Sequence, residues 1–436
     1  MWPEHRPSAR IMTTKSENRI LLVSPFPPFP PDCGSYQRTH LLWKALSEIA
    51  PVDVILCDDL PINGEVFAQG IPSSVNLLGR FQWQSKARRL TSRIPKNSAL
   101  NHRVEGLLRV ALPRHWEYEV DHQLSRNVSE VFDRKRYSLA VGRYLKPIVK
   151  TGLVGRVPSL LDIDDVDFDI FAQRAEDPGR PRWERLLYAL QSSQMKAAFE
   201  KWLPRFKKLW VTKAEDTQHA ATRNAAVLPN IPYNLPKGLA PLNGSSSCNP
   251  VILTVGVLFY LPNRDGIDRF IREGWPKVRA ACPTAEYWLV GKNDPASASR
   301  WGAVPGVKVL GYVEDLAAIY QASWFTLCPL WNGGGTNIKV LESLAFGRTC
   351  VATGIGHRGL GDVLKSGDSL LVAATAAELA ENCIQLINDR EKRLALAQRG
   401  HDVVREEFSY KKFASVVRRQ VEEALGDHLR TTANHS

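Results

Sequence analysis

Short apolar runs rich in β-branched residues alternate with helical patterns along most of the chain, and this alternation begins twice. The first series ends near residue 230, and a second series starts afresh at "VILTVG", residues 251–256. Such alternation is typical of parallel βα units, in which a helix follows each strand and packs on the sheet. We therefore predict an α/β protein with two Rossmann-like domains that face each other across a cleft, where ligands bind beyond the carboxyl ends of the strands.

The two series define the expected strands and domain boundaries. The strands of the first series are expected at residues 20–24, 52–57, 138–142, 159–164, 208–212 and 225–230, with a helix near residues 37–48. The strands of the second series are expected at residues 251–256, 286–291, 307–311, 324–328, 349–353 and 369–373. Pro, Gly and Ser are frequent between the two series, which is typical of a linker. We expect an N-terminal domain at residues 18–235, a linker at 236–249 and a C-terminal domain at 250–408. A C-terminal helix is expected at 409–425 and is a candidate to cross back to the N-terminal domain. Residues 1–17 and 426–436 are expected to be disordered.

The composition narrows the class of protein. The 436 residues are 44% hydrophobic and 23% charged, ordinary values for a globular chain that is long enough to form two cores. The formal net charge of +12 favours anionic partners such as nucleotides, nucleic acids or acidic lipid surfaces. The 7 cysteines never form a CxxC pair, which argues against a zinc site or a disulfide framework and fits a reducing cytoplasm. No segment offers a signal-peptide core or about 18 consecutive apolar residues, so we expect no membrane span.

The stretch "NGGGTNIKVLESLAFGR", residues 332–348, places glycines directly before a helical pattern and follows one of the expected strands. A helix N-terminus offers unpaired amide hydrogens and the positive end of the helix dipole, and glycines let a ligand approach the backbone. Lys339 and Glu342 share one face of this helix because they are three residues apart. The combination suits a ribose diphosphate, although a tight turn followed by a solvated Lys–Glu ion pair explains the same residues.

The longer segment "CPLWNGGGTNIKVLESLAFGRTCVATGIGHRGL" resembles the donor-binding region of family 4 glycosyltransferases with the GT-B fold. The resemblance covers most of residues 250–415, through "VGVLFYLPNRDGIDRFI", "YWLVGKN", "VLGYVEDLAAIYQAS" and "EEFSYKKF". In the family, two Glu residues separated by seven residues hold the sugar nucleotide, and the second binds the ribose hydroxyls. Glu342 stands at the second place, whereas Gly334 stands at the first, so the contact to the donor sugar must come from elsewhere. The donor-binding residues that the resemblance implies are Gly333, Gly334, Gly335, Thr336, Asn337 and Glu342.

The resemblance also implies which groups neutralise the donor diphosphate. Family members use an Arg and a Lys near the first strand of the C-terminal domain, and the absence of that motif leaves Lys339 and Arg264 as the candidate catalytic cations. Arg264 can equally be read as a solvated residue at a helix start. In the N-terminal half, "SPFPPFPPDCGSYQRTHLLWKAL" resembles the first strand, glycine loop and helix of the family. This match implies that Gly34, Ser35 and Arg38 approach the donor phosphate and the acceptor, although a helix that merely starts at Gly34 and a solvated Arg38 explain the same residues.

Clustered carboxylates in "LLDIDDVDFD", residues 160–169, end another expected strand. Carboxylate oxygens are the ligands that Mg²⁺ and Mn²⁺ prefer, but similar segments occur in GT-B relatives that need no metal. We therefore expect Asp162, Asp164 and Asp165 to cap a helix, order the cleft or touch the acceptor. We expect no metal, and no cofactor apart from the nucleotide-diphosphate sugar as donor substrate. His357 precedes "RGLGD" and is retained as a candidate nucleotide contact.

Two stretches account for much of the positive charge. Residues 80–114 and 196–210 are rich in Lys and Arg, and the second also contains aromatic residues. Such a mixture suits an anionic membrane surface, and a solvated basic face explains it equally well.

The resemblance implies a cytoplasmic, retaining hexosyltransferase that moves a sugar from a nucleotide-diphosphate sugar to a hydroxyl of a glycan or a lipid-linked acceptor. Its pathway would be the biosynthesis of cell-surface polysaccharide or lipopolysaccharide, with peripheral attachment at the inner face of the membrane. A nucleotide-sugar epimerase of the same fold would carry additional acid and base groups in the cleft. A non-catalytic nucleotide-sugar-binding subunit would bind the donor without turnover. A nucleic-acid binder would need aromatic platforms beside its cations, and these are found only within 196–210, so we expect no nucleic acid as partner.

Overall fold

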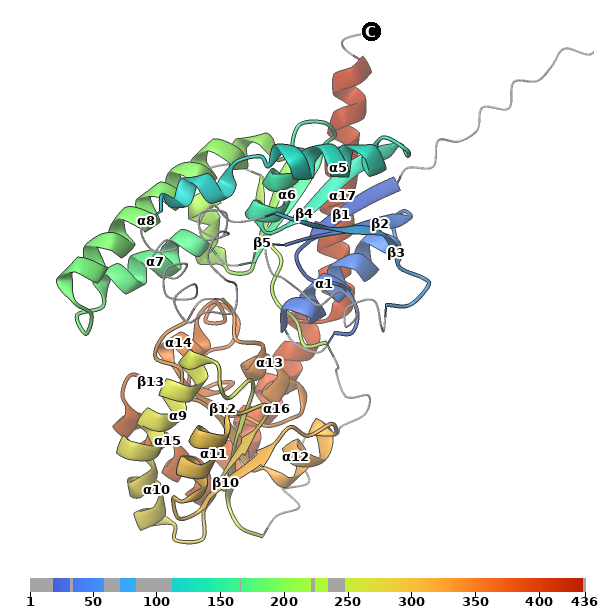
Figure 1. The fold of residues 1–436 in the computed structure, drawn as a ribbon. Coiled ribbons are helices and arrows are strands. Elements are labelled where there is room, and N and C mark those ends of the chain that lie inside the picture. The colour runs from blue at the N-terminus through green and yellow to red at the C-terminus, as the bar shows by residue number, and fades with distance from the viewer. Residues whose placement is uncertain are drawn as a thin grey trace, which may run out of the picture.

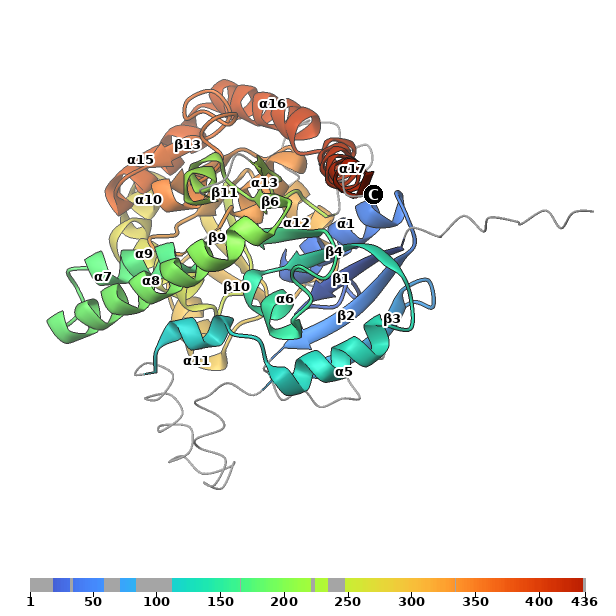
Figure 2. The same cartoon turned by 90° about the horizontal axis from the view of Figure 1, so that it is seen from above.

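The computed structural model describes residues 19–31, 34–58, 71–83, 112–164, 166–220, 224–233, 248–333 and 335–433. The segments expected to be disordered at 1–17, most of the linker at 236–249, Asp165 and Gly334 lie outside these residues, as does most of the basic stretch 80–114. The described chain forms two lobes, each built on a parallel sheet with helices on both faces (Figures 1 and 2). The predicted α/β architecture of two Rossmann-like domains is thus confirmed.

The N-terminal sheet has the strand order β3-β2-β1-β4-β5-β6-β7, and every neighbouring pair is parallel. Its strands are β1 Arg19–Ser24, β2 Val52–Asp58, β3 Asn76–Gln82, β4 Tyr137–Arg143, β5 Ser159–Asp164, β6 Lys208–Val211 and β7 Ala225–Val227. Its α-helices are α1 Gly34–Ser47, α5 His122–Phe132, α6 Leu145–Thr151, α7 Asp167–Glu176 and α8 Arg182–Trp202. Three short 3₁₀ helices complete the described part: η1 Arg114–Tyr118, η2 Leu203–Arg205 and η3 Ala214–Ala220.

The C-terminal sheet has the order β10-β9-β8-β11-β12-β13 and is also parallel. Its strands are β8 Val251–Val255, β9 Glu286–Val290, β10 Val307–Gly311, β11 Phe325–Cys328, β12 Cys350–Thr353 and β13 Leu371–Ala373. Its helices are α9 Leu261–Glu273, α10 Trp275–Ala281, α11 Pro295–Gly302, α12 Leu316–Ala322, α13 Ile338–Ala345, α14 Gly354–His357, α15 Ala376–Asn388, α16 Arg390–Glu407 and α17 Tyr410–Ala433.

All expected strands are present, and the structure adds β3, which was not predicted. The central strands β1 and β2 are almost entirely buried, whereas the residues of β3 are only half-buried or exposed along the edge of the sheet. The C-terminal helix α17 also extends beyond the expected end at residue 425, into the segment 426–433 that was expected to be a disordered tail.

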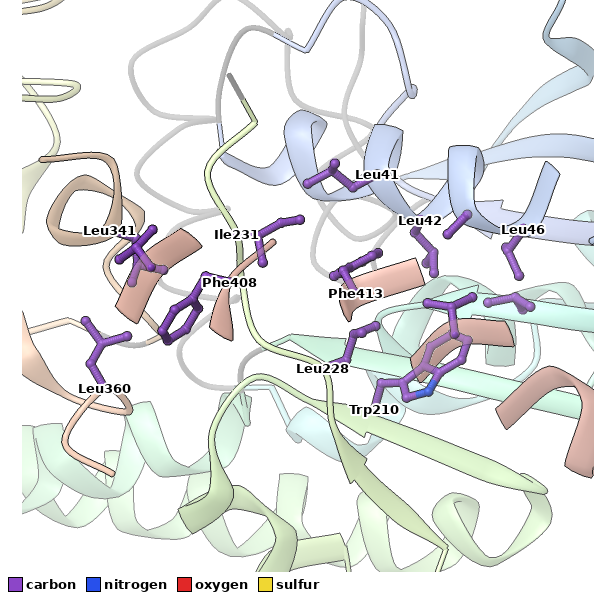
Figure 3. Close-up of a cluster of buried hydrophobic side chains, with 14 of the residues drawn as sticks. Leu41, Leu42, Leu46, Trp210, Leu228, Ile231, Leu341, Leu360, Phe408 and Phe413 are labelled. Carbon is purple, nitrogen blue, oxygen red and sulfur yellow. The ribbon is translucent and has the colours of Figure 1, made fainter. Parts of the chain in front are cut away.

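Helix α17 leaves the C-terminal lobe and runs along the N-terminal one, beside α1 (Figure 1). Its apolar side chains Phe413, Val417 and Val421 belong to one buried cluster with Leu42 and Leu46 of α1. Figure 3 shows this cluster, which also takes in Leu341, Leu360 and Phe408 from the C-terminal lobe, with Ile231 between the two groups. The lobes are therefore joined by a shared hydrophobic core in addition to the chain connections.

Each sheet has one place at which its strand order reverses. Each is built outward on both sides of its first strand, so the strand order reverses between β1 and β4 in the N-terminal sheet and between β8 and β11 in the C-terminal sheet. In open parallel sheets, ligands bind at such switch points, outside the carboxyl ends of the two diverging strands. The loops that follow these strands, 25–33 and 144 in one lobe and 256–260 and 329–337 in the other, are thus where the fold predicts a site.

Candidate functional site

The glycine loop follows β11 and leads directly into α13. Gly333 and Gly335 have φ values of 132° and 75°, which side-chain-bearing residues rarely adopt. Pro262 at the start of α9 lies against the loop, because a Cβ added to Gly333 would be 3.9 Å from the Pro262 Cβ. The structure thus brings the loops after β8 and β11 together at the switch point. Gly334, predicted to bind the donor, lies outside the described residues.

Helix α13 is fixed firmly, so that its N-terminus is held at the switch point. Its own side chains Val340, Leu341 and Leu344 are fully buried. Asn337, just before the helix, donates from Nδ2 to the carbonyl oxygens of Ile355 and Gly356, at 3.0 and 3.1 Å. The Asn337 side chain therefore holds the glycine loop against α14, which follows β12, rather than capping α13.

Thr336 offers an unused polar atom at the same place. Its side chain is 8% exposed, and its hydroxyl has no hydrogen-bond partner among the described residues. A buried hydroxyl without a partner costs about 1–3 kcal/mol, which a ligand oxygen at this position would recover. The first turn of α13 adds free amide hydrogens directed at the same region.

Lys339 points toward the loop after β8. Its Nζ donates to Oδ1 of Asn263 at 2.5 Å, and Asn263 in turn donates from Nδ2 to the carbonyl oxygen of Val257 at 2.7 Å. Gly256 leaves room for the ammonium group, since a Cβ at that position would lie 3.7 Å from Nζ. Burial lowers the pKa of Lys339, because no carboxylate compensates its desolvation among the groups that affect it. A half-buried cation whose contact is a neutral amide is well suited to receive an anion.

Glu342 lies one turn further along α13. Its Oε2 accepts a hydrogen bond of 3.1 Å from the hydroxyl of Tyr320. The ring of Tyr320 is 1% exposed and stacks on Phe346, with ring centroids 4.4 Å apart and planes 9° apart. Burial raises the pKa of Glu342, and the Tyr320 hydrogen bond acts in the opposite direction. Tyr320 therefore holds the carboxylate in one orientation, a role that the sequence did not indicate.

Arg264 is not brought into this group. Its side chain is 39% exposed, and its ion pair is with the neighbouring Asp265, at 3.8 Å. The neighbouring residue Asn263, not Arg264, contacts Lys339. The catalytic role expected for Arg264 stays a prediction.

The N-terminal lobe meets the site at the start of α1. A Cβ added to Gly34 would be 3.3 Å from Cδ1 of Ile338, the first residue of α13. The N-terminus of α1 therefore abuts the N-terminus of α13, and Gly34 and Ser35 lie beside the candidate donor loop. A larger residue at position 34 would have to displace Ile338.

Arg38 faces the opposite way, into the N-terminal lobe. It is 2% exposed, donates to both carboxylate oxygens of Asp162 at 2.9 and 2.5 Å, and also contacts Asn230 Oδ1 and the Leu228 carbonyl oxygen. Arg38 thus anchors α1 to the sheet. Its guanidinium group is buried and already paired, so it is not exposed to the phosphate or acceptor that it was expected to contact. Asp162 is likewise engaged, because Arg143 Nη1 donates to its Oδ2 at 2.7 Å.

Two residues with positive φ lie beside this pair, one at the N-terminal switch point and one at the end of the neighbouring strand β5. Tyr144, which directly follows β4, has a φ of 63°, and Asp164, the last residue of β5, has a φ of 61°. Such values are costly for bulky residues and concentrate at functional sites. The Tyr144 hydroxyl and Arg143 Nη2 donate to Asp164 Oδ2 at 2.9 and 2.8 Å. Although burial opposes it, Arg143 and then Arg38 lower the pKa of Asp164 to about 2.

Tyr144 thereby reaches the edge of the candidate site. Its ring packs edge-on against Phe26, with centroids 6.0 Å apart, and Arg143 Nη2 also donates to the carbonyl oxygen of Ser35 at 3.4 Å. In the sequence, the only signal for Tyr144 is its position directly after an expected strand. The structure thus joins the strained loop after β4 to the start of α1.

Two histidines contact backbone carbonyl oxygens, and the nucleotide contact expected of His357 stays a prediction. His357 Nε2 contacts the carbonyl oxygen of Leu364 at 2.5 Å, and His40 Nδ1 contacts that of Pro28 at 3.2 Å. Among the residues that the structure describes, no group of three His, Cys, Asp or Glu side chains could hold a metal ion. No helix in the described ranges has both the length and the apolar character that a membrane span requires.

Known proteins resemble this chain in sequence family and in fold. Residues 249–389 match the family model described as glycosyl transferases group 1. Sucrose-phosphate synthase from Thermosynechococcus elongatus matches with a TM-score of 0.63 and 16% identity, over 96% of this chain and 100% of that one. HepE from Anabaena, solved in complex with UDP, matches with a TM-score of 0.59 and 14% identity, over 93% and 100% of the two chains. WaaG, described as a glycosyltransferase involved in lipopolysaccharide biosynthesis, matches with a TM-score of 0.56 and 15% identity, over 91% and 98%. A comparison with curated protein sequences finds no match.

These likenesses extend over both lobes and confirm the predicted GT-B fold. Together with the family model in the C-terminal lobe, they support a glycosyltransferase.

Proposed function

We propose that this protein transfers a sugar from a nucleotide-diphosphate donor to an acceptor hydroxyl, with retention of the anomeric configuration, as family 4 glycosyltransferases do. The observation that carries the proposal is the arrangement on α13. Thr336, just before α13, presents an unpaired hydroxyl at the C-terminal switch point, and Lys339 and Glu342 on α13 present a cation without a carboxylate and a fixed carboxylate. The distance along the helix from a first-turn phosphate to Glu342 suits a ribose linked to that phosphate.

In this proposal the diphosphate lies at the glycine loop, where the amides of α13 and Lys339 stabilise the charge that grows on the leaving group. Glu342 accepts hydrogen bonds from the ribose hydroxyls. Exposed aromatic side chains at the ends of β8 and β10, Phe259, Tyr260 and Tyr312, offer a surface on which the base can stack. No metal or cofactor is needed for this stabilisation, and the donor sugar itself is the second substrate.

The acceptor is proposed to enter from the N-terminal lobe. Gly34 adjoins the start of α13, and Arg143, next to the strained Tyr144, donates to the carbonyl oxygen of Ser35. A glycan or lipid-linked acceptor bound there would present its hydroxyl to the anomeric carbon. Closure of the lobes would exclude water and limit donor hydrolysis. By analogy with WaaG, we propose a cytoplasmic role in the synthesis of a cell-surface polysaccharide or lipopolysaccharide.

Thermal unfolding in the presence of nucleotide sugars tests the proposal. We expect one of the UDP, GDP, ADP or dTDP sugars to raise the midpoint of the wild-type protein by about 3 °C or more when present at about 100 times its Kd. Glu342→Ala should lose most of this shift, whereas Glu381→Ala, an exposed glutamate on α15, should keep it. The absence of a shift with every donor would overturn the donor site. A donor shift without any release of nucleoside diphosphate in the presence of acceptor extracts would favour a non-catalytic binding subunit.

A second experiment concerns Tyr320. A protonated Glu342 cannot accept the ribose hydroxyls, so affinity for the nucleotide should fall as the pH drops through the raised pKa of this group. Tyr320→Phe removes the hydrogen bond that lowers this pKa, so the loss should begin at a higher pH. We expect this in calorimetric titrations between about pH 5 and 8.

The control is the 2′,3′-dideoxy form of the same nucleotide, which carries the same titrating phosphates but no ribose hydroxyls. Its binding should depend on pH identically in the wild-type protein and in Tyr320→Phe. If Tyr320→Phe shifted the pH dependence of binding equally for both nucleotides, Tyr320 would act through general packing and not through Glu342.

A further inference from the structure

Helix α8 presents an apolar surface that neither the fold nor the candidate site uses. Its C-terminal half is anchored in the N-terminal core by Met195, Phe199 and Trp202. Its N-terminal half packs on α7, and the pair forms a hairpin at one side of the N-terminal lobe (Figure 1). The two halves of α8 therefore have different surroundings.

Three large apolar side chains of α8 face outward. Trp183, Leu186 and Leu190 are 65%, 73% and 56% exposed. Because they are spaced three and four residues apart, they form one stripe along the helix. In the described part of the N-terminal lobe, the other exposed large apolar side chain is Val227, at 38%. A contiguous stripe of this kind marks an interaction surface, whereas single exposed residues do not.

The charges around the stripe indicate the partner. Arg182 precedes the stripe, Lys201 continues the same side of the helix, and Lys196 lies on an adjoining exposed side. All three are exposed, as are Arg205 and Lys207 beyond the helix end, against one exposed acid, Glu200, on this part of α8. Glu184 is engaged by Arg180 at 3.3 Å. A helix with Trp and Leu on one face and flanking cations is typical of segments that lie in the interface of an anionic bilayer.

We propose that the outer face of α8, defined by Trp183, Leu186 and Leu190 with its flanking cations, docks on an anionic lipid bilayer. The apolar stripe inserts at the headgroup level and the cations meet the lipid phosphates. This surface lies N-terminal to most of the basic stretch 196–210, so the apolar half of the interface was not visible from composition. The proposal is independent of the donor chemistry, because no residue of α8 contacts the candidate site in the described structure.

Vesicle co-sedimentation tests the docking surface. The purified full-length protein should pellet with vesicles of equal parts phosphatidylcholine and phosphatidylglycerol, and much less with phosphatidylcholine alone. A variant with Trp183→Ser, Leu186→Ser and Leu190→Ser should bind the anionic vesicles at least about tenfold more weakly. Because the stripe is exposed, this variant should unfold at the same temperature as the wild-type protein.

The electrostatic part has its own matched pair. Lys196→Glu with Lys201→Glu should weaken binding to anionic vesicles, whereas Lys277→Glu with Arg405→Glu, the same charge change on exposed positions of the C-terminal lobe, should not. Equal binding by the wild-type protein and the triple serine variant would overturn the proposal, as would absence of wild-type binding to the anionic vesicles. A wild-type dimer that the serine variant converts to a monomer, with no vesicle binding, would assign the stripe to a second copy of the chain instead.

Discussion

Lys339→Met is expected to lower kcat by about 10²–10³-fold while changing donor affinity much less. The reason is that Lys339 meets negative charge that increases as the bond to the diphosphate breaks, so its contribution is largest in the transition state. Release of nucleoside diphosphate, measured with the donor that gives the thermal shift, reports the rate. Methionine keeps the length of the side chain and removes only the charge.

Loss of folding cannot produce the same result. Burial already disfavours the charged form of Lys339, so a neutral side chain at this position should not destabilise the protein. Lys277→Met, on the exposed surface of α10, is the matched control and should keep full activity. If Lys339→Met instead raised KM and left kcat unchanged, the ammonium group would bind the ground state and transition state equally, and its catalytic role would be refuted.

Asp162→Ala should have the largest effect on stability. Asp162 is fully buried and pairs with both Arg38 and Arg143, at 2.5 and 2.7 Å, so its removal leaves two buried guanidinium groups short of a counter-ion. Breaking a buried pair from one side costs about 3–5 kcal/mol. Urea unfolding, followed by circular dichroism, should show a midpoint well below that of the wild-type protein or an insoluble product.

An exposed pair of similar length provides the contrast. Asp133 accepts from Arg156 at 2.6 Å, but the two side chains are 59% and 37% exposed. Asp133→Ala should therefore change the free energy of unfolding by no more than about 1 kcal/mol. Equal effects of the two substitutions would mean that the Arg38–Asp162–Arg143 network does not hold α1 to the sheet.

The sequence predicted the sheets well because buried parallel strands are continuous apolar runs, and these can be recognised locally. β3 escaped because a glycine and an arginine interrupt the apolar residues of its sequence NLLGRFQ, so it lacks that signal. The end of α17 was placed too early because its last turns are polar, and polarity alone does not terminate a helix that is already nucleated and packed on α1.

The candidate site divides in the same way. The glycine loop, Lys339 and Glu342 are neighbours in the sequence, so their shared helix face follows from spacing alone. Their partners are distant: Asn263 is 76 residues from Lys339, and Tyr320 is 22 residues from Glu342. No local pattern links such pairs. For the same reason Arg38 was assigned to a ligand, since its actual partner, Asp162, is 124 residues away.

Helix α17 has a consequence for the order in which the chain can fold. The surface of α1 that Phe413, Val417 and Val421 cover belongs to a domain whose strands are synthesised first, yet α17 emerges only after the whole C-terminal lobe. At about 5–20 residues per second, the ribosome takes on the order of ten seconds or more to reach it. During that interval the apolar surface of α1 in the nascent N-terminal lobe stays uncovered. Until α17 packs on it, this surface is exposed to chaperones and to other unfolded chains.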